Sequence, residues 1–228
     1  MSRSALPLLF LVMLRCSDLT EGAGGVIGLE IRTPEVLTIE VGETLPLSAR
    51  ALDKNGDSVA AAITWRAPDA TLTVDPLTGV ITGISPGAGR VQAFAGQRAS
   101  GLVQFTVIPS ADTLILTDSV FTVAPGVPAS PPLVAQVQSF NPAGPLADRP
   151  VVYAITSPPD IGPRTVELPG GVLIDTLTTG TDGAVSSVTL NRVAGIAQPD
   201  TAIVEVRAFR THGAAVPGSG QRFIVVFQ

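Results

Sequence analysis

Few side chains of this sequence could do chemistry, and the rarest types occur only once. The 228 residues include one Cys, one His, one Trp and one Tyr. The chain therefore cannot close an internal disulfide or assemble a His/Cys metal cluster. A histidine-based catalytic triad would have to use His212, for which we expect a solvated loop. Phosphate-binding loops and H-E-x-x-H motifs do not occur in the sequence, so we expect no catalytic residue, metal, cofactor or enzyme activity.

One acidic segment, Asp53-Lys54-Asn55-Gly56-Asp57, resembles the beginning of a calcium loop. Loops of the EF-hand type need Gly at position 6 and Glu at position 12. The corresponding places hold Ser58 and Thr64. The Asn-Gly pair instead favours a tight hairpin turn, because both residues tolerate positive φ. A calcium site at a domain junction that uses Asp112 and Asp118 stays open, although no pattern selects it.

The aromatic residues could stack on sugars if they were exposed. The chain has eight Phe, together with Trp65 and Tyr153. Trp65 follows Ile63 at a spacing of two, which places both side chains on the same face of a strand. We therefore predict a buried Trp65. Sugar binding through Tyr153 is kept as the alternative.

The elements that would position these residues are short strands. The chain has 23 Gly and 20 Pro, 45% of its residues are hydrophobic and 14% are charged. Apolar and polar residues alternate between turn signals about 8–12 residues apart, which is typical of β-sandwiches. Pro109-Ser110-Ala111 interrupts this pattern. We therefore predict two all-β domains, over residues 26–109 and 110–228.

The alternation also selects core and turn residues. The predicted structural core contains Leu47, Ile63, Trp65, Val91 and Phe105. Glycines are expected where the chain must turn, because they adopt positive φ at little cost. The predicted turn glycines are Gly42, Gly56, Gly79, Gly83, Gly87 and Gly183.

The N-terminus has the features of an export signal. Arg3 precedes an apolar run over residues 5–14, which is too short to span a bilayer. We predict a signal peptide over residues 1–16 and a flexible tether over residues 17–25. Cys16 resembles the lipidated cysteine of bacterial lipoproteins, although Arg15 stands where that motif has a small residue. Lipidation of Cys16, simple cleavage and an uncleaved anchor are all open, and membrane contact is expected only through this segment or its lipid.

Residues 29–108 resemble the bacterial immunoglobulin-like domain of group 2, which occurs in intimin-type adhesins and many surface proteins. The matching segments, in order, are Val41-Gly42-Glu43-Thr44-Leu45, Leu52-Asp53-Lys54-Asn55-Gly56, Ile63-Thr64-Trp65, Val74-Asp75, Thr78-Gly79-Val80-Ile81-Thr82-Gly83-Ile84 and Pro86-Gly87. The resemblance implies an immunoglobulin-like sandwich and no catalytic residues.

Residues 112–228 resemble more loosely the group 1 domain of the invasin and intimin family. The matching segments are Pro145-Leu146-Ala147-Asp148-Arg149-Pro150-Val151, Thr181-Asp182-Gly183-Ala184 and Ala194-Gly195. Together the two resemblances imply tandem immunoglobulin-like β-sandwiches after the signal segment.

The expected function is that of a non-enzymatic, exported bacterial protein, either extracellular or in the cell envelope. The resemblances imply adhesion, surface display, or a spacer or binding role, with an unknown protein or glycan as partner. The net charge of −5 offers no basic face for nucleic acid, so we expect no nucleic-acid partner. The alternative is a carbohydrate-binding or enzyme-accessory protein of the envelope.

Lipidation predicts that the protein takes up a labelled fatty acid in growing cells and that Cys16→Ala abolishes the labelling. The physical reason is that Cys16 carries the only thiol of the chain. A Cys16→Ala protein that labels as strongly as the wild type would exclude the lipoprotein hypothesis.

Overall fold

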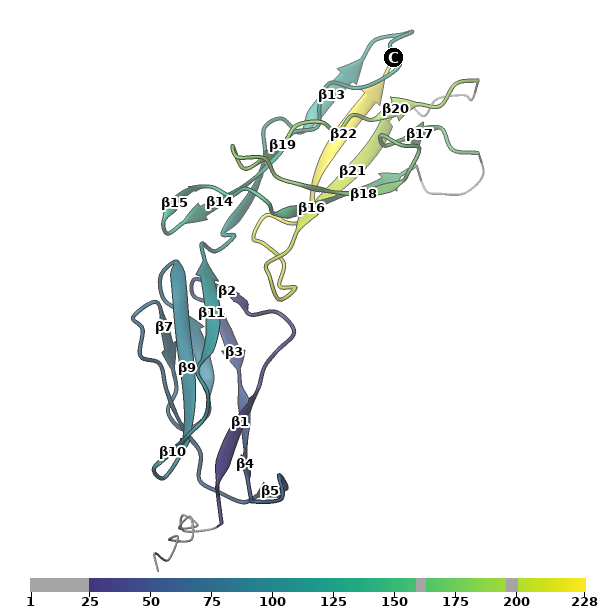
Figure 1. Cartoon of the computed structure of the whole chain (residues 1–228). Coiled ribbons are helices and arrows are strands. Elements are labelled where there is room, and N and C mark those ends of the chain that lie inside the picture. Colours follow the sequence, from purple (N-terminus) through teal and green to yellow (C-terminus); the bar gives the residue numbers. More distant parts are fainter. Residues whose placement is uncertain (1–24, 159–162, 196–200) are drawn as a thin grey trace, which may run out of the picture.

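Alternation of side chains gives the strands one buried and one exposed face. In β11 (Val103–Ile108), Phe105 and Val107 are buried while Gln104 and Thr106 are exposed. The computed structural model describes residues 25–158, 163–195 and 201–228, and this part is built of strands, turns and loops without a helix (Figure 1). It accordingly contains no helix that could cross a membrane. The predicted all-β class is confirmed, whereas the signal peptide, Cys16 and residues 17–24 of the tether lie outside the described residues.

The first half of the described chain folds into one sandwich. Its strands are β1 (Gly28–Arg32), β2 (Thr38–Glu40), β3 (Thr44–Pro46), β4 (Ser48–Leu52), β5 (Ser58–Val59), β6 (Thr64–Arg66), β7 (Leu72–Val74), β8 (Val80–Gly83), β9 (Gly87–Ala95), β10 (Arg98–Ala99) and β11. One layer has the order β10-β9-β11-β2, and β6 also pairs with β9. The other layer consists of two small sheets with the orders β1-β4-β5 and β3-β8-β7. The chain passes directly from one to the other, because only Leu47 separates β3 from β4.

The second half folds into a second sandwich. Its strands are β12 (Thr113–Leu116), β13 (Val120–Val123), β14 (Ala135–Phe140), β15 (Ala143–Pro145), β16 (Pro150–Ser157), β17 (Val166–Glu167), β18 (Ile174–Thr178), β19 (Ala184–Val185), β20 (Asn191–Arg192), β21 (Thr201–Ala208) and β22 (Gln221–Phe227). The larger layer has the order β13-β22-β21-β16-β18. The facing layer has the order β12-β14-β15, with β19 also paired to β14, and β17 pairs with β20.

Both sandwiches are closed by the same kind of strand pair. In the first, β2 pairs in parallel with the last strand, β11; in the second, β13 pairs in parallel with the last strand, β22. The other ladders between named strands are antiparallel and stay within residues 28–108 or 113–227. The chain therefore folds as two tandem immunoglobulin-like β-sandwiches. The sheets change between Ile108 and Thr113, where the sequence places the boundary.

The core of the first sandwich surrounds the Trp65 indole, whose residue is 5% exposed. Leu47, Val91 and Phe105 belong to the same buried cluster, and the half-buried Ile63 packs against it. The turn from β7 to β8 covers the indole ring, and Trp65 donates its backbone N–H to the Pro76 carbonyl at 3.0 Å. This packing explains why the turn needs a glycine at position 79. A Cβ on Gly79 would lie 2.6 Å from Trp65 Cε2.

The core of the second sandwich is built around Tyr153, which is fully buried. Its ring stacks on Phe223 with centroids 6.3 Å apart, and its hydroxyl donates to the Leu133 carbonyl at 3.1 Å. Burial raises the pKa of the Tyr153 hydroxyl well above its ordinary value. The sugar-stacking alternative for Tyr153 is therefore wrong, because the ring has no face open to a ligand.

Five of the six predicted turn glycines have positive φ. They are Gly42, Gly56, Gly79, Gly87 and Gly183. Gly83 is the exception, because it is the last residue of β8 and its φ is not positive. A Cβ there would lie 2.5 Å from the backbone oxygen of Glu40. The turn prediction for Gly83 is therefore corrected, since a close approach between two strands requires this glycine.

We predict that Gly79→Ala destabilises the first sandwich more than Gly56→Ala does. Both glycines have positive φ, so each alanine costs about 1–2 kcal/mol of backbone strain. Gly79→Ala also forces the indole to move, which adds about 1–3 kcal/mol of overpacking. Denaturant unfolding followed by Trp65 fluorescence measures the difference. Equal losses for the two variants would show that the turn does not pack on Trp65.

Candidate functional site at the domain junction

A buried carboxylate joins the two sandwiches. Glu40 ends β2, which lies in the first sandwich (Figure 1). Its side chain is fully buried and contacts residues of the second sandwich. Its Oε1 accepts from Arg149 Nη1 at 3.0 Å and from the backbone N–H and hydroxyl of Thr211, each at 3.1 Å. Its Oε2 accepts from the Ala111 backbone N–H at 2.8 Å, and Arg210 Nε lies 3.8 Å away. We call this set, with Glu43, Asp112 and His212, the junction.

Backbone hydrogen bonds hold Arg149 in the position from which its side chain reaches Glu40. Arg149 precedes β16, and its backbone N–H donates to the Thr179 hydroxyl at 3.0 Å. The Thr179 N–H donates back to the Arg149 carbonyl at 2.9 Å. Arg149 Nη2 donates to the Pro109 carbonyl at 2.7 Å. The guanidinium therefore binds both Glu40 and the chain segment that links the domains.

Arg210 and Asp112 form a second layer on the linker side of the junction. Arg210 follows β21 and donates through Nε to the Ala111 carbonyl at 3.1 Å. Its Nη2 lies 3.3 Å from Asp112 Oδ1, which also accepts from the Ser110 hydroxyl. Asp112 Oδ2 accepts from the Phe140 backbone N–H at 2.7 Å. These contacts tie the linker to the end of β14 and to the loop that follows β21.

His212 adds a contact that sequence reasoning missed. It lies in the expected loop, between β21 and β22, but its Nδ1 lies 3.0 Å from Glu43 Oε1 in the first sandwich. The residue is exposed, as expected for a loop, while its side chain is 24% exposed and contacts Glu43. The contact forms because the loop lies over the turn after β2, where Glu43 Oε2 also accepts from the Glu40 N–H at 2.9 Å.

The turn that carries Glu43 follows from local sequence. Gly42 has a φ of 77°, and the Glu43 N–H donates to the Glu40 carbonyl at 3.0 Å. The Gly42 N–H donates to the Gly83 carbonyl at 2.8 Å, which joins the turn to β8. The small Gly83 leaves room for this approach. The Val-Gly-Glu segment noted in the sequence therefore places two carboxylates at the end of the first sandwich.

The hydrogen bonds of the junction join the two sandwiches and the linker to one another. Both oxygens of Glu40 already accept hydrogen bonds from groups of the protein. A carboxylate taken out of water is stable only when hydrogen bonds and an opposite charge replace its hydration. Among the described residues, no group of three His, Cys, Asp or Glu side chains is arranged to hold a metal ion.

The calcium hypotheses can be compared with these contacts. Asp112 is paired with Arg210, and β12 separates it from the exposed Asp118. Asp53 Oδ1 accepts from the N–H groups of Asn55 and Asp57, each at 2.9 Å. These hydrogen bonds lower the pKa of Asp53, and the segment forms the hairpin that pairs β4 with β5. The hairpin interpretation therefore describes this segment.

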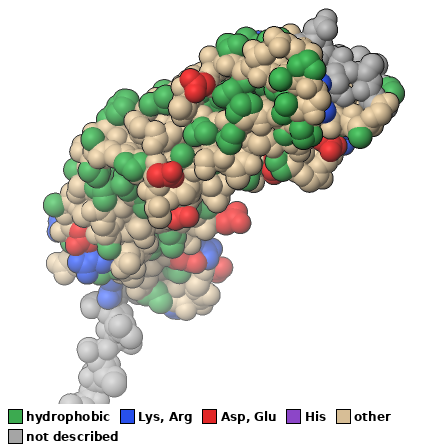
Figure 2. Space-filling view, turned by 90° about the horizontal axis from the view of Figure 1, so that it is seen from above, with side chains coloured by type: hydrophobic (Ala, Val, Ile, Leu, Met, Phe, Trp, Pro, Cys, Tyr) green, Lys and Arg blue, Asp and Glu red, His purple; other side chains and the backbone are tan. Residues whose placement is uncertain are grey.

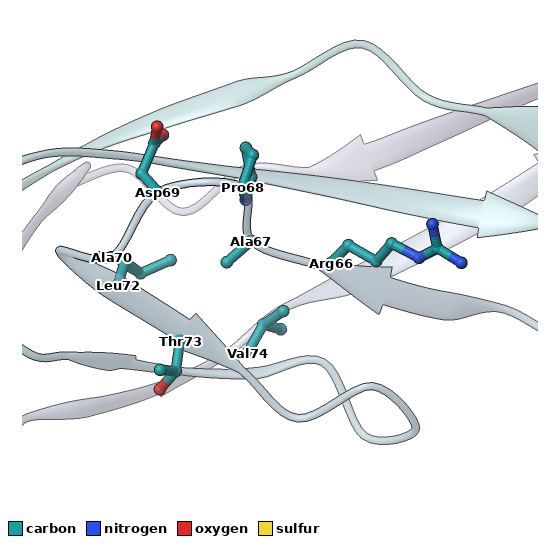
Figure 3. Close-up of a pocket in the computed structure, with 8 residues that line it drawn as sticks. All are labelled: Arg66, Ala67, Pro68, Asp69, Ala70, Leu72, Thr73 and Val74. Carbon is teal, nitrogen blue, oxygen red and sulfur yellow. The ribbon is translucent and has the colours of Figure 1, made fainter.

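A shallow hollow is present elsewhere on the first sandwich. Its volume is about 490 Å³, and it lies between β7 and the loop that precedes it. Figure 3 shows Leu72 and Ala67 pointing toward its middle, while the Arg66 side chain extends away from Asp69. Asp69 is already bound by Arg90 through Nε and Nη2, at 2.8 and 2.9 Å, and Arg66 lies over the Phe94 ring. The charged side chains of Asp69 and Arg66, near the hollow, therefore already interact with other side chains of the protein.

The comparisons with known proteins give distant structural likenesses. No protein-family model and no curated protein matches the chain. The chain is similar to the adhesin InvE of Yersinia pseudotuberculosis, with 15% identity and a TM-score of 0.40; the match covers 91% of this chain and 61% of the adhesin. It is also similar to the fibronectin(III)-like modules of Clostridium thermocellum CbhA, with 17% identity, a TM-score of 0.40 and coverage of 88% and 94%.

A third likeness is to the D00-D0 domain of intimin, with 17% identity, a TM-score of 0.31 and coverage of 87% of this chain and 99% of that one. The chain thus spans about three fifths of the length of the Yersinia adhesin. Likenesses of this size do not assign a function or a group of immunoglobulin-like domains. The group 2 and group 1 assignments stay predictions.

We predict that Glu40→Gln lowers the free energy of unfolding by about 3–5 kcal/mol, as removal of one partner of a buried ion pair does. The amide leaves Arg149 without its counter-charge, and its NH₂ group faces the Ala111 N–H. Trp65 reports unfolding of the first sandwich and Tyr153 that of the second, because each residue type occurs once.

The matched control is Glu30→Gln in the same domain. Glu30 pairs with Arg50 at 2.6 Å, but the two side chains are 51% and 40% exposed. Exposed pairs of this kind contribute about 0–1 kcal/mol. If Glu40→Gln cost no more than Glu30→Gln, the junction would not couple the domains.

Proposed function

We propose that the chain is a non-enzymatic, exported module of the bacterial cell envelope or surface. In this proposal its two sandwiches form a stiff spacer for adhesion or surface display. The observation that carries the proposal is the buried Glu40 carboxylate, which accepts from the linker, from Arg149 and from Thr211. Contacts between domains of one chain usually permit relative motion. Here three separate segments converge on one carboxylate, which opposes both bending and twisting.

The short linker supports the same proposal. Only residues 109–112 separate β11 from β12. Their polar groups are bound by the second sandwich, since Arg149 binds the Pro109 carbonyl and Arg210 the Ala111 carbonyl. A linker held in this way transmits the orientation of one sandwich to the next. A spacer needs this property because it sets the distance between an anchor and a binding end.

Recognition by such a module would use strand edges and end loops. On the face seen in Figure 2, acidic and basic side chains form small separate groups among hydrophobic and neutral atoms. Several acidic side chains are paired with Arg, including Asp69 with Arg90 and Glu205 with Arg207. Loops and edges held by a rigid scaffold are common sites of protein recognition. The partner we propose is a surface protein or glycan, and not a nucleic acid.

The carbohydrate-binding alternative has less support. Trp65 is 5% exposed and Tyr153 is fully buried, so neither offers a stacking face. Among the aromatic residues that the structure describes, Phe140, at the end of β14, is the exposed one, at 67%.

The proposal predicts a narrow distribution of distances between spin labels in the two sandwiches. Labels at Gln104→Cys and Thr122→Cys, in a Cys16→Ser background, lie on exposed positions of β11 and β13. Glu40→Gln should broaden the distribution measured by pulsed electron paramagnetic resonance, whereas Glu30→Gln should not. A broad distribution in the parent protein would exclude a stiff spacer.

Chemical labelling of intact cells tests whether the protein is displayed on the cell surface. A membrane-impermeant amine reagent should label Lys54, which is exposed in the hairpin between β4 and β5. Lys54→Arg is the control, because it keeps the charge and removes the amine. Labelling of Lys54 only after the cells are lysed would exclude surface display and leave the stiffness result standing.

A further inference from the structure

The strand β18 forms one edge of the larger sheet of the second sandwich. It pairs with β16 on one side and ends the strand order β13-β22-β21-β16-β18. Ile155 donates its N–H to the Leu173 carbonyl at 2.9 Å, and Thr179 donates its N–H to the Arg149 carbonyl at 2.9 Å. In an antiparallel ladder the bonded pairs alternate. The odd-numbered residues of β18 therefore face β16, and Ile174, Thr176 and Thr178 point their backbone groups outward.

The side chains of this edge do little to block another strand. Natural sheets protect their edges with charges, prolines, bulges or very short strands. Such protection is visible at several other edges: β15 contains Gly144-Pro145, β5 and β10 have two residues each, and β1 contains Glu30 and Arg32. At the two edges of this sheet, β13 has four residues without a charge, and the longer β18 has five residues with one charge, Asp175. Ile174 is 63% exposed, and Thr176 and Thr178 are exposed as well.

We propose that β18 pairs in antiparallel fashion with β18 of a second copy of this chain, around a two-fold axis through Thr176. In this register Ile174 lies opposite Thr178 of the second copy, and Thr176 lies opposite its own counterpart. All three pairs bring outward-facing backbone groups together, which gives about six hydrogen bonds. The two larger sheets then become one continuous sheet across both molecules.

The charge on Asp175 selects this register. With the axis through Thr176, Asp175 lies opposite Leu177 of the second copy, so the two carboxylates do not face each other. An axis through Asp175 would place the two carboxylates directly opposite each other, where like charges destabilise a strand pair. An axis through Leu177 would also match outward-facing groups, but it would leave Ile174 unpaired. The register around Thr176 uses the whole strand and covers the exposed Ile174.

The expected association is weak in dilute solution and stronger where molecules are concentrated. One five-residue strand pair falls short of the interface of about 1,200–2,000 Å² that stable complexes bury. Tethering of many copies to one surface raises their effective concentration and favours pairing between neighbours. The pairing itself does not depend on the tether, so it can be measured on the purified full chain.

Disulfide cross-linking tests the register directly. In a Cys16→Ser background, Thr176→Cys should form a covalent dimer under mild oxidation. Paired Cα atoms lie about 5.5 Å apart, within the range that a disulfide spans. Ile174→Cys and Thr178→Cys should each stay monomeric alone and should cross-link to each other when mixed. Thr106→Cys, an exposed Thr→Cys change on β11, which has a neighbouring strand on each side, is the matched control and should stay monomeric.

A second variant separates strand pairing from other association. Thr176→Pro removes an outward-facing N–H and leaves the bonds to β16, so the domain should fold and self-association should be lost in sedimentation at high protein concentration. Three results would overturn the proposal: a wild-type chain that stays monomeric, a dimer that Thr176→Pro leaves intact, and cross-links that ignore the predicted register.

Discussion

The carboxylate of Glu40 is the constraint on which the arrangement of this molecule depends. It belongs to the first sandwich, yet its partners are the linker amide of Ala111, the Arg149 guanidinium and the N–H and hydroxyl of Thr211. A fully buried carboxylate that lost these partners would have to be solvated again or neutralised. Each partner therefore keeps its place because the others cannot satisfy the charge alone. These contacts favour one orientation of the two domains over others.

The same interaction explains why the junction is polar. Apolar contacts stabilise two surfaces in many relative orientations, since burial depends on area rather than direction. Charge-assisted hydrogen bonds depend on angle and distance, and a guanidinium offers donors in a fixed fork. Arg149 uses one nitrogen for Glu40 and another for the Pro109 carbonyl. We infer that the pair contributes orientation more than net stability, as buried ion pairs can.

The apolar core of the first sandwich could be predicted because its signal is local. Alternation places Trp65 and Ile63 on one face, and the Asn-Gly pair at Asn55-Gly56 marks a hairpin. Each statement concerns residues within a few positions of one another. Gly83 shows the limit of such reasoning. It has the composition signal of a turn, but a contact with the Glu40 backbone in a neighbouring strand requires it. The contact of His212 with Glu43 shows the same limit, because the two residues are far apart in sequence.

The sequence by itself indicated the all-β class, a change of domain near residue 109 and the residues that fill the core of the first sandwich. It could do so because a period of two and the turn residues between strands are properties of short segments. The tertiary structure alone decided the junction. Arg149 lies 109 residues after Glu40 in the sequence, and Thr211 lies 171 residues after it. No local pattern relates the three residues. Only the folded chain shows that the charged end of one strand meets a loop and a guanidinium of the other domain, and that β18 is left as an open edge.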